Sequence, residues 1–135
     1  MSEKIIIRVV VSSEAKLAEE IETRIGLSAD RVWRKGEFRP KTIIREKTSG
    51  WIIENEFPVS TEIEEAVCVT LRRLDPLGEK LHELGSEFRK ELSVVIYCSR
   101  MPAMALSSAV TKMLGANDLG LDFDFFISPE SAAEA

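Results

Sequence analysis

The sequence predicts an α+β fold: a ferredoxin-like βαββαβ series with an appended αβ unit, forming a mostly antiparallel five-stranded sheet with helices on one face. Two β-branched runs without Gly or Pro, Ile5 to Val11 and Leu92 to Cys98, are typical of buried strands in the middle of a sheet. Strand-like and helix-like stretches follow one another in the order β-α-β-β-α-β-α-β, which contains the ferredoxin-like series. Each helical stretch has one apolar stripe, which fits packing on a single face.

Length and composition fit one ordinary globular domain. The chain has 135 residues, of which 44% are hydrophobic and 30% charged. We expect a single domain over residues 1–128 and a flexible, small and acidic tail over residues 129–135. The net charge of −5 argues against a nucleic-acid partner, because phosphate binding needs a concentrated basic surface.

The sequence also bears on location. It contains no apolar segment of the roughly 20 residues needed to span a membrane, and its N-terminus lacks the pattern of a signal peptide. We therefore expect a cytoplasmic protein without a membrane partner. Its two cysteines, Cys68 and Cys98, lie in apolar surroundings and are expected to be reduced thiols, since nothing near them is spaced for metal ligation.

The first half of the chain begins with the strand 5–11. Ser13 then predicts the cap of a helix over residues Glu14 to Ile25, and Gly26 predicts its left-handed end. A short strand is expected around Arg31 to Lys35. The polar stretch from Gly36 to Ser49 contains a proline and predicts a long exposed loop or a loosely paired extension.

A clear strand follows from Trp51 to Phe57. Thr61 and Glu64 have the spacing of a capping box, which predicts the start of the second helix. The pair Asp75-Pro76 interrupts this helix, and a further helical segment is predicted from Leu77 to Leu84. Four leucines at positions 74, 77, 81 and 84 continue one apolar seam across the interruption.

The last third contains the strand 92–98, a turn, a third helix and a closing strand. The third helix is predicted to carry Leu106, Val110 and Leu114 on its apolar face and to stop at Gly115. The closing strand, Leu121 to Ile127, alternates Asp with Phe.

Several of these pieces, in this order, resemble a bacterial family known only as domain of unknown function 4279. They are the N-terminal strand, Ile25 to Asp30, Arg34 to Glu37, Ser49 to Trp51, and the closing Asp122 to Phe125. The resemblance covers nearly the whole chain. It implies a fold and supplies no catalytic residue, because no activity is established for that family.

Strand parity predicts a mixed surface on the sheet face opposite the helices, which Glu54 and Glu56 are also able to join. Its predicted members are Arg8, Ser93, Tyr97, Ser99, Asp122 and Asp124, with Ile6, Val10, Val95 and Phe126 among them. Such a face suits a second copy of the chain, a shallow ligand site, or plain solvation. We take Arg8, Tyr97, Asp122 and Asp124 as candidate ligand-binding residues.

Asp122 and Asp124 are two residues apart on a strand, so their carboxylates project to the same side about 7 Å apart. This spacing suits a divalent cation or an acid/base pair. The simpler interpretation is an edge strand whose charges discourage aggregation, or an ion pair with Arg8. We predict no metal site and no catalytic residue.

A second candidate is the basic and aromatic stretch around residues 33–41. Here Arg34, Lys35 and Gly36 have the chemistry of an anion-binding loop, with the glycine allowing close approach. The alternative is a solvated loop. The single histidine, His82, lies beside the apolar seam and is expected at the rim of the core, because no nucleophile is placed next to it in sequence.

Three functions are compatible with these features. The first is a non-enzymatic, immunity-like interaction protein that neutralises or docks a partner. The acidic charge and the half-apolar sheet face favour this function. The second is a small-molecule-binding regulatory module with a ligand at a homodimer interface. The third is an enzyme using Arg8, Asp122 and Asp124. We prefer the first, and we predict no cofactor.

Overall fold

The computed structural model describes residues 3–128, so the predicted tail over residues 129–135 lies outside the described residues. The strands are β1 Lys4–Ser13, β2 Arg31–Trp33, β3 Ser49–Pro58, β4 Arg89–Cys98 and β5 Gly120–Ile127. The helices are α1 Ala18–Ile25, α2 Ile63–Arg72, the 3-10 turn η1 Asp75–Leu77, α3 Lys80–Glu83 and α4 Ser108–Ala116.

The five strands form one sheet in the order β2-β3-β1-β4-β5. The pairs β2–β3, β3–β1 and β1–β4 are antiparallel, whereas β4 and β5 run parallel, so the sheet is mixed. A parallel pair needs a crossover connection, which α4 provides between β4 and β5. The α+β class and the five strands are confirmed. Both strands expected in the middle of the sheet, now β1 and β4, have a neighbour on each side.

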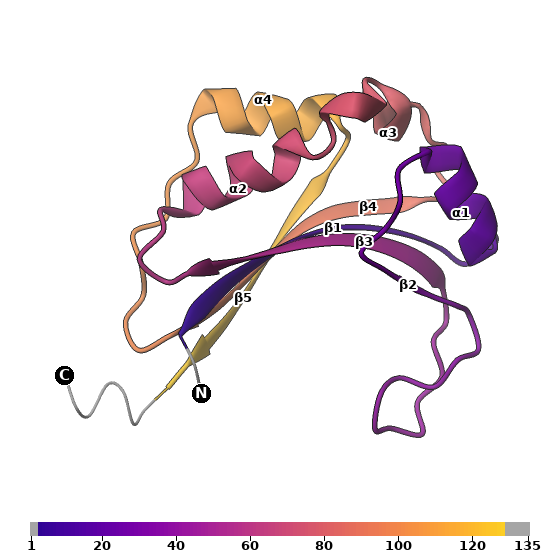
Figure 1. The fold of residues 1–135 in the computed structure, drawn as a ribbon, viewed down its shortest axis with the longest axis horizontal. Helices are drawn as coiled ribbons and strands as arrows, with labels where there is room; N and C mark the ends of the chain where they lie inside the picture. The colour runs from indigo at the N-terminus through magenta and orange to yellow at the C-terminus, as the bar shows by residue number, and fades with distance from the viewer. Residues whose placement is uncertain (1–2, 129–135) are drawn as a thin grey trace.

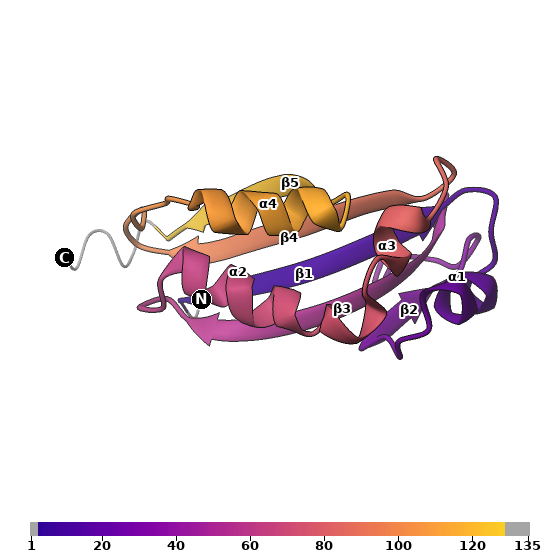
Figure 2. The same cartoon turned by 90° about the horizontal axis from the view of Figure 1, so that it is seen from above.

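All four α-helices lie against one face of the sheet, as the side view and the view from above show together (Figures 1 and 2). None of them, within residues 3–128, is long and apolar enough to cross a membrane. The core lies between the helices and the sheet. It contains every second residue of β1, from Ile5 to Val11, together with the four leucines of the predicted seam, all of which are buried.

The start of the first helix differs from the prediction. Helix α1 begins at Ala18, not at Glu14, although it ends at Gly26 in the left-handed conformation that the sequence predicted. The Ser13 hydroxyl accepts hydrogen bonds from the backbone N–H groups of Ala15 and Lys16. These bonds close a local turn before the helix, because a serine hydroxyl can satisfy nearby backbone donors without starting a helix.

The predicted capping box is also wrong. Helix α2 begins at Ile63 after Glu62, and no side chain caps it. The Glu64 carboxylate instead accepts a hydrogen bond of 2.7 Å from the backbone N–H of Ser107, just before α4. Hydrogen bonding by the Ser107 side chain, and then by its backbone N–H, lowers the pKa of Glu64. Glu64 therefore connects α2 to the start of α4 rather than to its own helix end.

Two further helix boundaries differ. The segment predicted as one helix from Leu77 to Leu84 is a 3-10 turn and one turn of α-helix, separated by Gly78 at a φ of 57°. Helix α4 starts only after Ser107, whose hydroxyl accepts from the N–H of Val110, and it continues through Gly115. The left-handed residue at its end is Asp118, with a φ of 56°.

A buried lysine that the sequence analysis missed connects three elements. The Nζ of Lys90, on the helix side of β4, donates to the carbonyls of Leu81 at 3.0 Å and Leu84 at 3.4 Å. It also forms an ion pair with Asp118 at 2.6 Å. A buried ammonium needs such partners, because an isolated charge is costly to remove from water. Lys90 thereby joins α3 and the turn before β5 to β4.

Asp118 should make stability depend on pH. Its hydrogen bond and ion pair with Lys90 lower the pKa of Asp118 below that of a free aspartate. A lowered folded-state pKa stabilises the fold above the unfolded pKa, about 3.9, and this contribution is lost as pH falls through the folded pKa. Asp118→Asn, which keeps the left-handed backbone accessible, should therefore be destabilised by a constant amount from about pH 5 to pH 8. The difference from wild type, followed by urea denaturation, should shrink below about pH 4. A difference that grows on acidification would contradict the ion pair.

Candidate functional site

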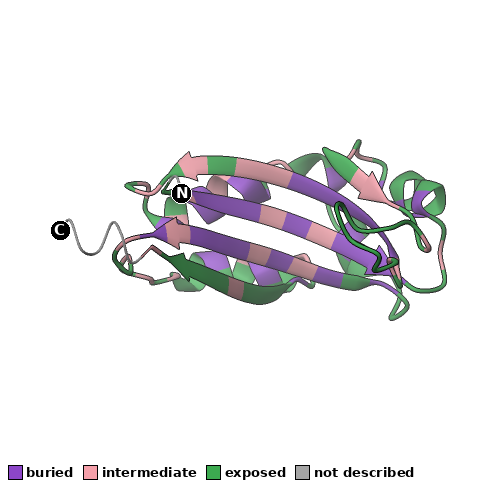
Figure 3. Cartoon of the chain, turned by 90° about the horizontal axis from the view of Figure 1, so that it is seen from below, coloured by how far each residue is buried: buried purple, intermediate pink, exposed green. Residues whose placement is uncertain are grey.

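The face of the sheet opposite the helices carries no helix in the described part of the chain (Figure 3). We call it the open face. The strand register defines its residues, because directly paired residues project to the same side. Three rows of paired residues cross it from β3 to β5. They are Glu56, Ile6, Val95 and Asp124; Glu54, Arg8, Ser93 and Asp122; and Ile52, Val10, Glu91 and Gly120.

All four candidate ligand-binding residues lie on this face, but they do not converge on one point. Arg8 and Asp122 share a row with Ser93 between them, which places their backbones roughly 10 Å apart at the usual strand spacing. Asp124 lies in the next row. Tyr97 pairs with Lys4 and Phe126 at the end of the face.

Arg8 does not pair with either aspartate, contrary to one alternative drawn from the sequence. Its Nε donates to Glu54 Oε1 at 3.0 Å, on the neighbouring strand β3. Lys4 and Glu56 form a longer pair, 3.7 Å, on the same two strands. The charges at the centre of the open face are therefore balanced in pairs between β1 and β3.

An aromatic pair lies at the β4–β5 side of the open face. The rings of Tyr97 and Phe126 stack with centroids 5.0 Å apart, and Lys4 Nζ lies 5.6 Å from the Tyr97 centroid. Phe126 is 48% exposed. Next to this pair, the backbone N–H of Ser99 donates to the Glu3 carboxylate. Hydrogen bonding by the Ser99 side chain, and then by this N–H, lowers the pKa of Glu3. Stacked, half-exposed aromatics are common anchors in protein interfaces.

The two aspartates of β5 are exposed and project to the same side, as predicted. Among residues 3–128, no group of three or more His, Cys, Asp or Glu side chains is arranged to hold a metal ion. His82 is exposed, at the rim of the core as predicted, and Cys98 is buried, which raises the pKa of its thiol.

The predicted anion-binding loop has its cations engaged elsewhere. Arg34 forms ion pairs with Glu19, at 2.7 Å, and with Glu37, at 3.7 Å. Lys35 Nζ donates to the carbonyl of Glu14. Gly36 does adopt a positive φ of 91°, but it serves a loosely paired loop in which its N–H donates to Glu46. These contacts hold the loop against the helix α1 region and engage both cations with groups of the chain itself.

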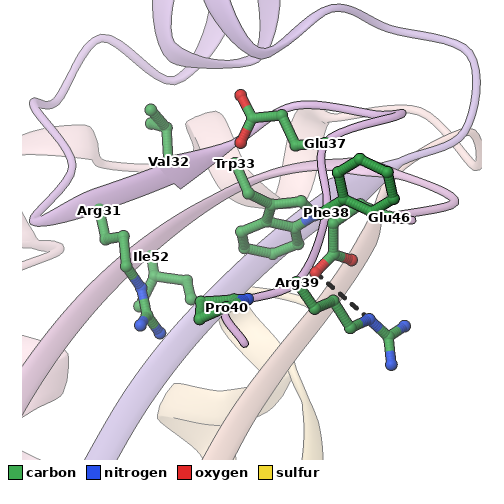
Figure 4. Close-up of a pocket in the computed structure, with 9 residues that line it drawn as sticks. All are labelled: Arg31, Val32, Trp33, Glu37, Phe38, Arg39, Pro40, Glu46 and Ile52. Atoms are coloured by element: carbon green, nitrogen blue, oxygen red, sulfur yellow. Dashed lines mark ion pairs between the residues drawn. The ribbon is translucent and has the colours of Figure 1, made fainter. Parts of the chain in front are cut away.

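The same loop forms a pocket that the sequence analysis did not predict. A cavity of about 370 Å³ lies between the loop and the outer strands β2 and β3. Its lining residues are Arg31, Val32, Trp33, Glu37, Phe38, Arg39, Pro40, Glu46 and Ile52. Figure 4 shows the Trp33 ring at the centre of this group, with Arg39 turned toward Glu46 in an ion pair of 3.3 Å.

Arg31 is the other cation of the pocket. In the described part of the chain it has no carboxylate within ion-pair distance, whereas Arg39 is paired. Arg31 pairs with Ile52 across β2 and β3, so both side chains lie on the open face at the pocket wall. The size of this pocket is within the usual range of small-ligand sites, and its lining combines apolar and aromatic side chains with four charged ones.

An ion pair before β2 positions this wall. Arg73, just after α2, binds both carboxylate oxygens of Asp30, at 2.7 and 2.9 Å, and Asp30 also accepts from the N–H of Glu54 at 2.7 Å. The hydrogen bond from Arg73 lowers the pKa of Asp30. This bidentate pair holds the chain at the start of β2 against β3.

The Trp33 ring lies directly over Gly50, which explains the glycine in β3. A Cβ added at Gly50 would lie 2.0 Å from Trp33 Cη2. The indole N–H of Trp33 also donates to Thr48 at 3.3 Å. A larger residue at position 50 is therefore incompatible with the observed ring position.

Gly50→Ala should displace the Trp33 ring from the pocket floor. We expect a loss of about 1–2 kcal/mol in the free energy of unfolding, typical of overpacking, and a red shift of tryptophan fluorescence as the ring moves toward water. Gly115→Ala is the matched control, because Gly115 is exposed in the last turn of α4 and a Cβ there meets nothing within 4 Å. It should stabilise the chain by about 0.5–1 kcal/mol. Unchanged fluorescence in Gly50→Ala would contradict the stacking.

Comparison with known proteins identifies a family but no relative of known function. Comparisons with curated proteins and with solved structures return no match. The family model described as "Domain of unknown function (DUF4279)" matches residues 4–128, from the first residue of β1 to the residue after β5. The sheet, its helices and both candidate regions fall within these limits, and the chain belongs to the DUF4279 family.

Proposed function

We propose that this chain is a small non-enzymatic, immunity-like protein-binding module that docks a partner through the open face. The observation that carries the proposal is the one-sided covering of the sheet: the helices lie on one face and leave the other without a helix in the described part of the chain (Figure 3). That other face carries charged side chains beside an aromatic pair. The proposal includes a ferredoxin-like core formed by β1 to β4, supported by the order of elements, and a cytoplasmic location, supported by the free thiols of Cys68 and Cys98.

The open face has the layout of a protein interface. Ile6, Ile52 and Val95 project to it but are less than a tenth exposed, so neighbouring side chains on that face shield them. The more accessible part consists of the ion pair of Arg8 with Glu54, the exposed carboxylates of Asp122 and Asp124, and the stack of Tyr97 on Phe126. A few aromatic anchors bordered by polar groups carry most of the energy in many interfaces. We therefore assign Tyr97 and Phe126 the role of anchor.

Position-specific cross-linking tests this proposal. A photoreactive residue at Tyr97 should cross-link one partner in cells, whereas the same residue at Lys112, exposed on α4, should not. With that partner purified, Tyr97→Ala should weaken binding at least tenfold, as expected for an interface anchor. Cross-links from Lys112 but not from Tyr97 would contradict the proposal. A cross-linked second copy of the chain would instead identify the homodimer expected from the sequence.

A specific observation favours a second candidate, a small-molecule-binding module. The pocket beneath the loop combines the Trp33 and Phe38 rings with the guanidinium of Arg31, which has no ion-pair partner among residues 3–128. This chemistry suits a planar ligand with an anionic group, held by ring contacts and by one ion pair. In this form the ligand occupies a single chain and not a dimer interface.

A thermal-shift screen tests this second candidate. Planar aromatic carboxylates and inorganic phosphate serve as probes, and a bound carboxylate should raise the melting temperature of wild type by an amount that grows with the logarithm of its concentration relative to its dissociation constant. Arg31→Gln should abolish the shift while Arg72→Gln, an exposed arginine at the end of α2, should retain it. A shift that survives Arg31→Gln would place the ligand elsewhere.

A further inference from the structure

Strand β5 forms an edge of the sheet that is unusually exposed. Seven of its eight residues are exposed, and the eighth, Phe123, is half-buried. The exposed residues include Leu121 at 42%, Phe126 at 48% and Ile127 at 51%. Native edge strands are usually short, covered or protected, because their unpaired backbone groups are a template for another strand. This edge has eight residues and no covering element in the described part of the chain.

The direction of the free backbone groups follows from one hydrogen bond. The N–H of Ser128 donates to the carbonyl of Cys98 at 2.9 Å, so it points toward β4. Backbone groups of successive residues in a strand alternate in direction. The N–H and C=O groups that point away from β4 therefore belong to Leu121, Phe123, Phe125 and Ile127.

The side chains of the same four residues project to the helix side of the sheet, next to an apolar hollow. Phe123 and Phe125 stack with centroids 6.1 Å apart. Phe123 also lines a hollow of about 310 Å³ together with Ile63, Met104, Ala105 and Leu106. In a strand added to this edge, every second side chain would project to the helix side and lie next to this apolar surface.

The other side of the edge is acidic. Asp122 and Asp124 project to the open face, and within residues 3–128 neither forms an ion pair. The chain as a whole carries a net charge of −5. The two sides thus differ in chemistry: carboxylates on the open side and apolar side chains on the helix side.

From this arrangement we propose that β5 receives an extended strand of a basic partner protein, in which Lys or Arg alternates with apolar residues. The backbone of the partner would pair with the free groups of β5, the usual mode of strand addition. Its basic residues would face Asp122 and Asp124, and its apolar residues would face the hollow. Pairing of β5 with β5 of a second copy is disfavoured, since it brings four carboxylates onto one side of a two-stranded ribbon.

This inference goes beyond docking on the open face, because it uses the strand edge and a defined partner chemistry. The two can fail separately. A partner that cross-links at Tyr97 but ignores a block of the β5 edge would support the open face alone. If a substitution that blocks the β5 edge abolishes binding, and no partner cross-links at Tyr97, the result would support strand addition at β5 and not docking on the open face.

The test measures fluorescence anisotropy of a labelled peptide, Lys-Val-Lys-Ile-Arg-Val-Lys, titrated with the full chain at low salt. The probe should bind at least tenfold more tightly than an acidic peptide with Glu in place of each Lys or Arg. It should also bind more tightly than a peptide of the same composition with the basic and apolar residues in separate blocks. The double variant Asp122→Asn, Asp124→Asn should lose about threefold to tenfold in affinity, as expected for two exposed ion pairs, and should show a weaker salt dependence.

Phe125→Pro is the decisive variant and Phe125→Ala its matched control. Proline removes the outward N–H and obstructs an added strand, yet is tolerated at an edge where that N–H does not bond within the sheet. Both variants lose the ring, but only proline should reduce peptide binding at least tenfold below the alanine variant, with unchanged far-UV circular dichroism. Equal binding by the two variants would overturn the proposal, as would equal binding of all peptides. A dimer mass for wild type that becomes monomeric in Phe125→Pro would show that a second copy occupies the edge.

Discussion

Replacing Trp51 with alanine should lower the free energy of unfolding by about 3–5 kcal/mol, the usual cost of removing a large buried aromatic side chain. Trp51 has no exposed surface and is among the largest side chains of the core. Its indole N–H donates to the carbonyl of Leu27 at 2.9 Å, which ties the segment after α1 to β3. The substitution removes both the packing and the hydrogen bond.

Urea denaturation followed by circular dichroism measures this loss, and two variants separate its causes. Trp51→Phe keeps most of the ring volume but leaves the Leu27 carbonyl without its donor, so it should cost about 1–2 kcal/mol. Trp33→Ala removes the other tryptophan, which is half-buried outside the core, and should cost less than Trp51→Ala. Equal losses for Trp51→Ala and Trp33→Ala would contradict the placement of Trp51 in the core.

Lys90→Ala should destabilise the chain by about 2–4 kcal/mol through two separate effects. The aliphatic stem of Lys90 is buried and packs on the helix side of β4. Its ammonium supplies hydrogen bonds to the carbonyls of Leu81 and Leu84, which end the short helix α3. Asp118 is largely exposed and is hydrated again when the lysine is removed. Loss of the ion pair between Lys90 and Asp118 therefore contributes least to the destabilisation.

Lys90→Met separates the stem from the ammonium. Methionine restores most of the apolar stem, so this variant should recover about 1–2 kcal/mol relative to Lys90→Ala. The remaining loss measures the two carbonyls left without a donor. Amide hydrogen exchange in α3 should accelerate in both variants, because the carbonyl bonds that fix this turn are absent. A methionine variant as stable as wild type would show that the buried ammonium contributes no net stability.

The division of the sheet into two faces could be predicted because it depends on a simple periodicity. In β1, Ile5, Ile7 and Val9 are fully buried beneath the helices, while Arg8 between them projects to the open face and pairs with Glu54. A period of two residues fixes the side of every residue once a strand is recognised. The placement of Arg8, Tyr97, Asp122 and Asp124 on the open face therefore followed from the sequence. Glu91 was missed there, because β4 begins before Leu92, the predicted start of that strand.

Partners of polar side chains could not be predicted in the same way. Glu64 has the spacing of a capping residue, but its carboxylate accepts a hydrogen bond from the N–H of Ser107, a residue distant in sequence. The sequence suggested an ion pair of Arg8 with Asp122 or Asp124, but the strand register places Glu54 beside Arg8, and the two form the pair. Such choices depend on distances between elements, which local spacing does not contain.

The pocket and the buried lysine were missed for a related reason. Trp33 and Gly50 are separated by a long loop, and only the pairing of β2 with β3 brings the ring over the glycine. Lys90 belongs to a polar run that precedes the apolar strand, a pattern more typical of solvent than of a core. Neither feature leaves a local signal that distinguishes it from an ordinary loop or surface.

The parallel pairing of β4 with β5 has a consequence for how the molecule opens. β1 is bonded along both of its sides, whereas β5 is bonded along one and buries little of its own surface. We therefore expect β5 to separate from β4 at a lower free energy than global unfolding, while the four antiparallel strands persist. Such a separation would expose the backbone edge of β4 and leave a four-stranded sheet in which every neighbouring pair is antiparallel.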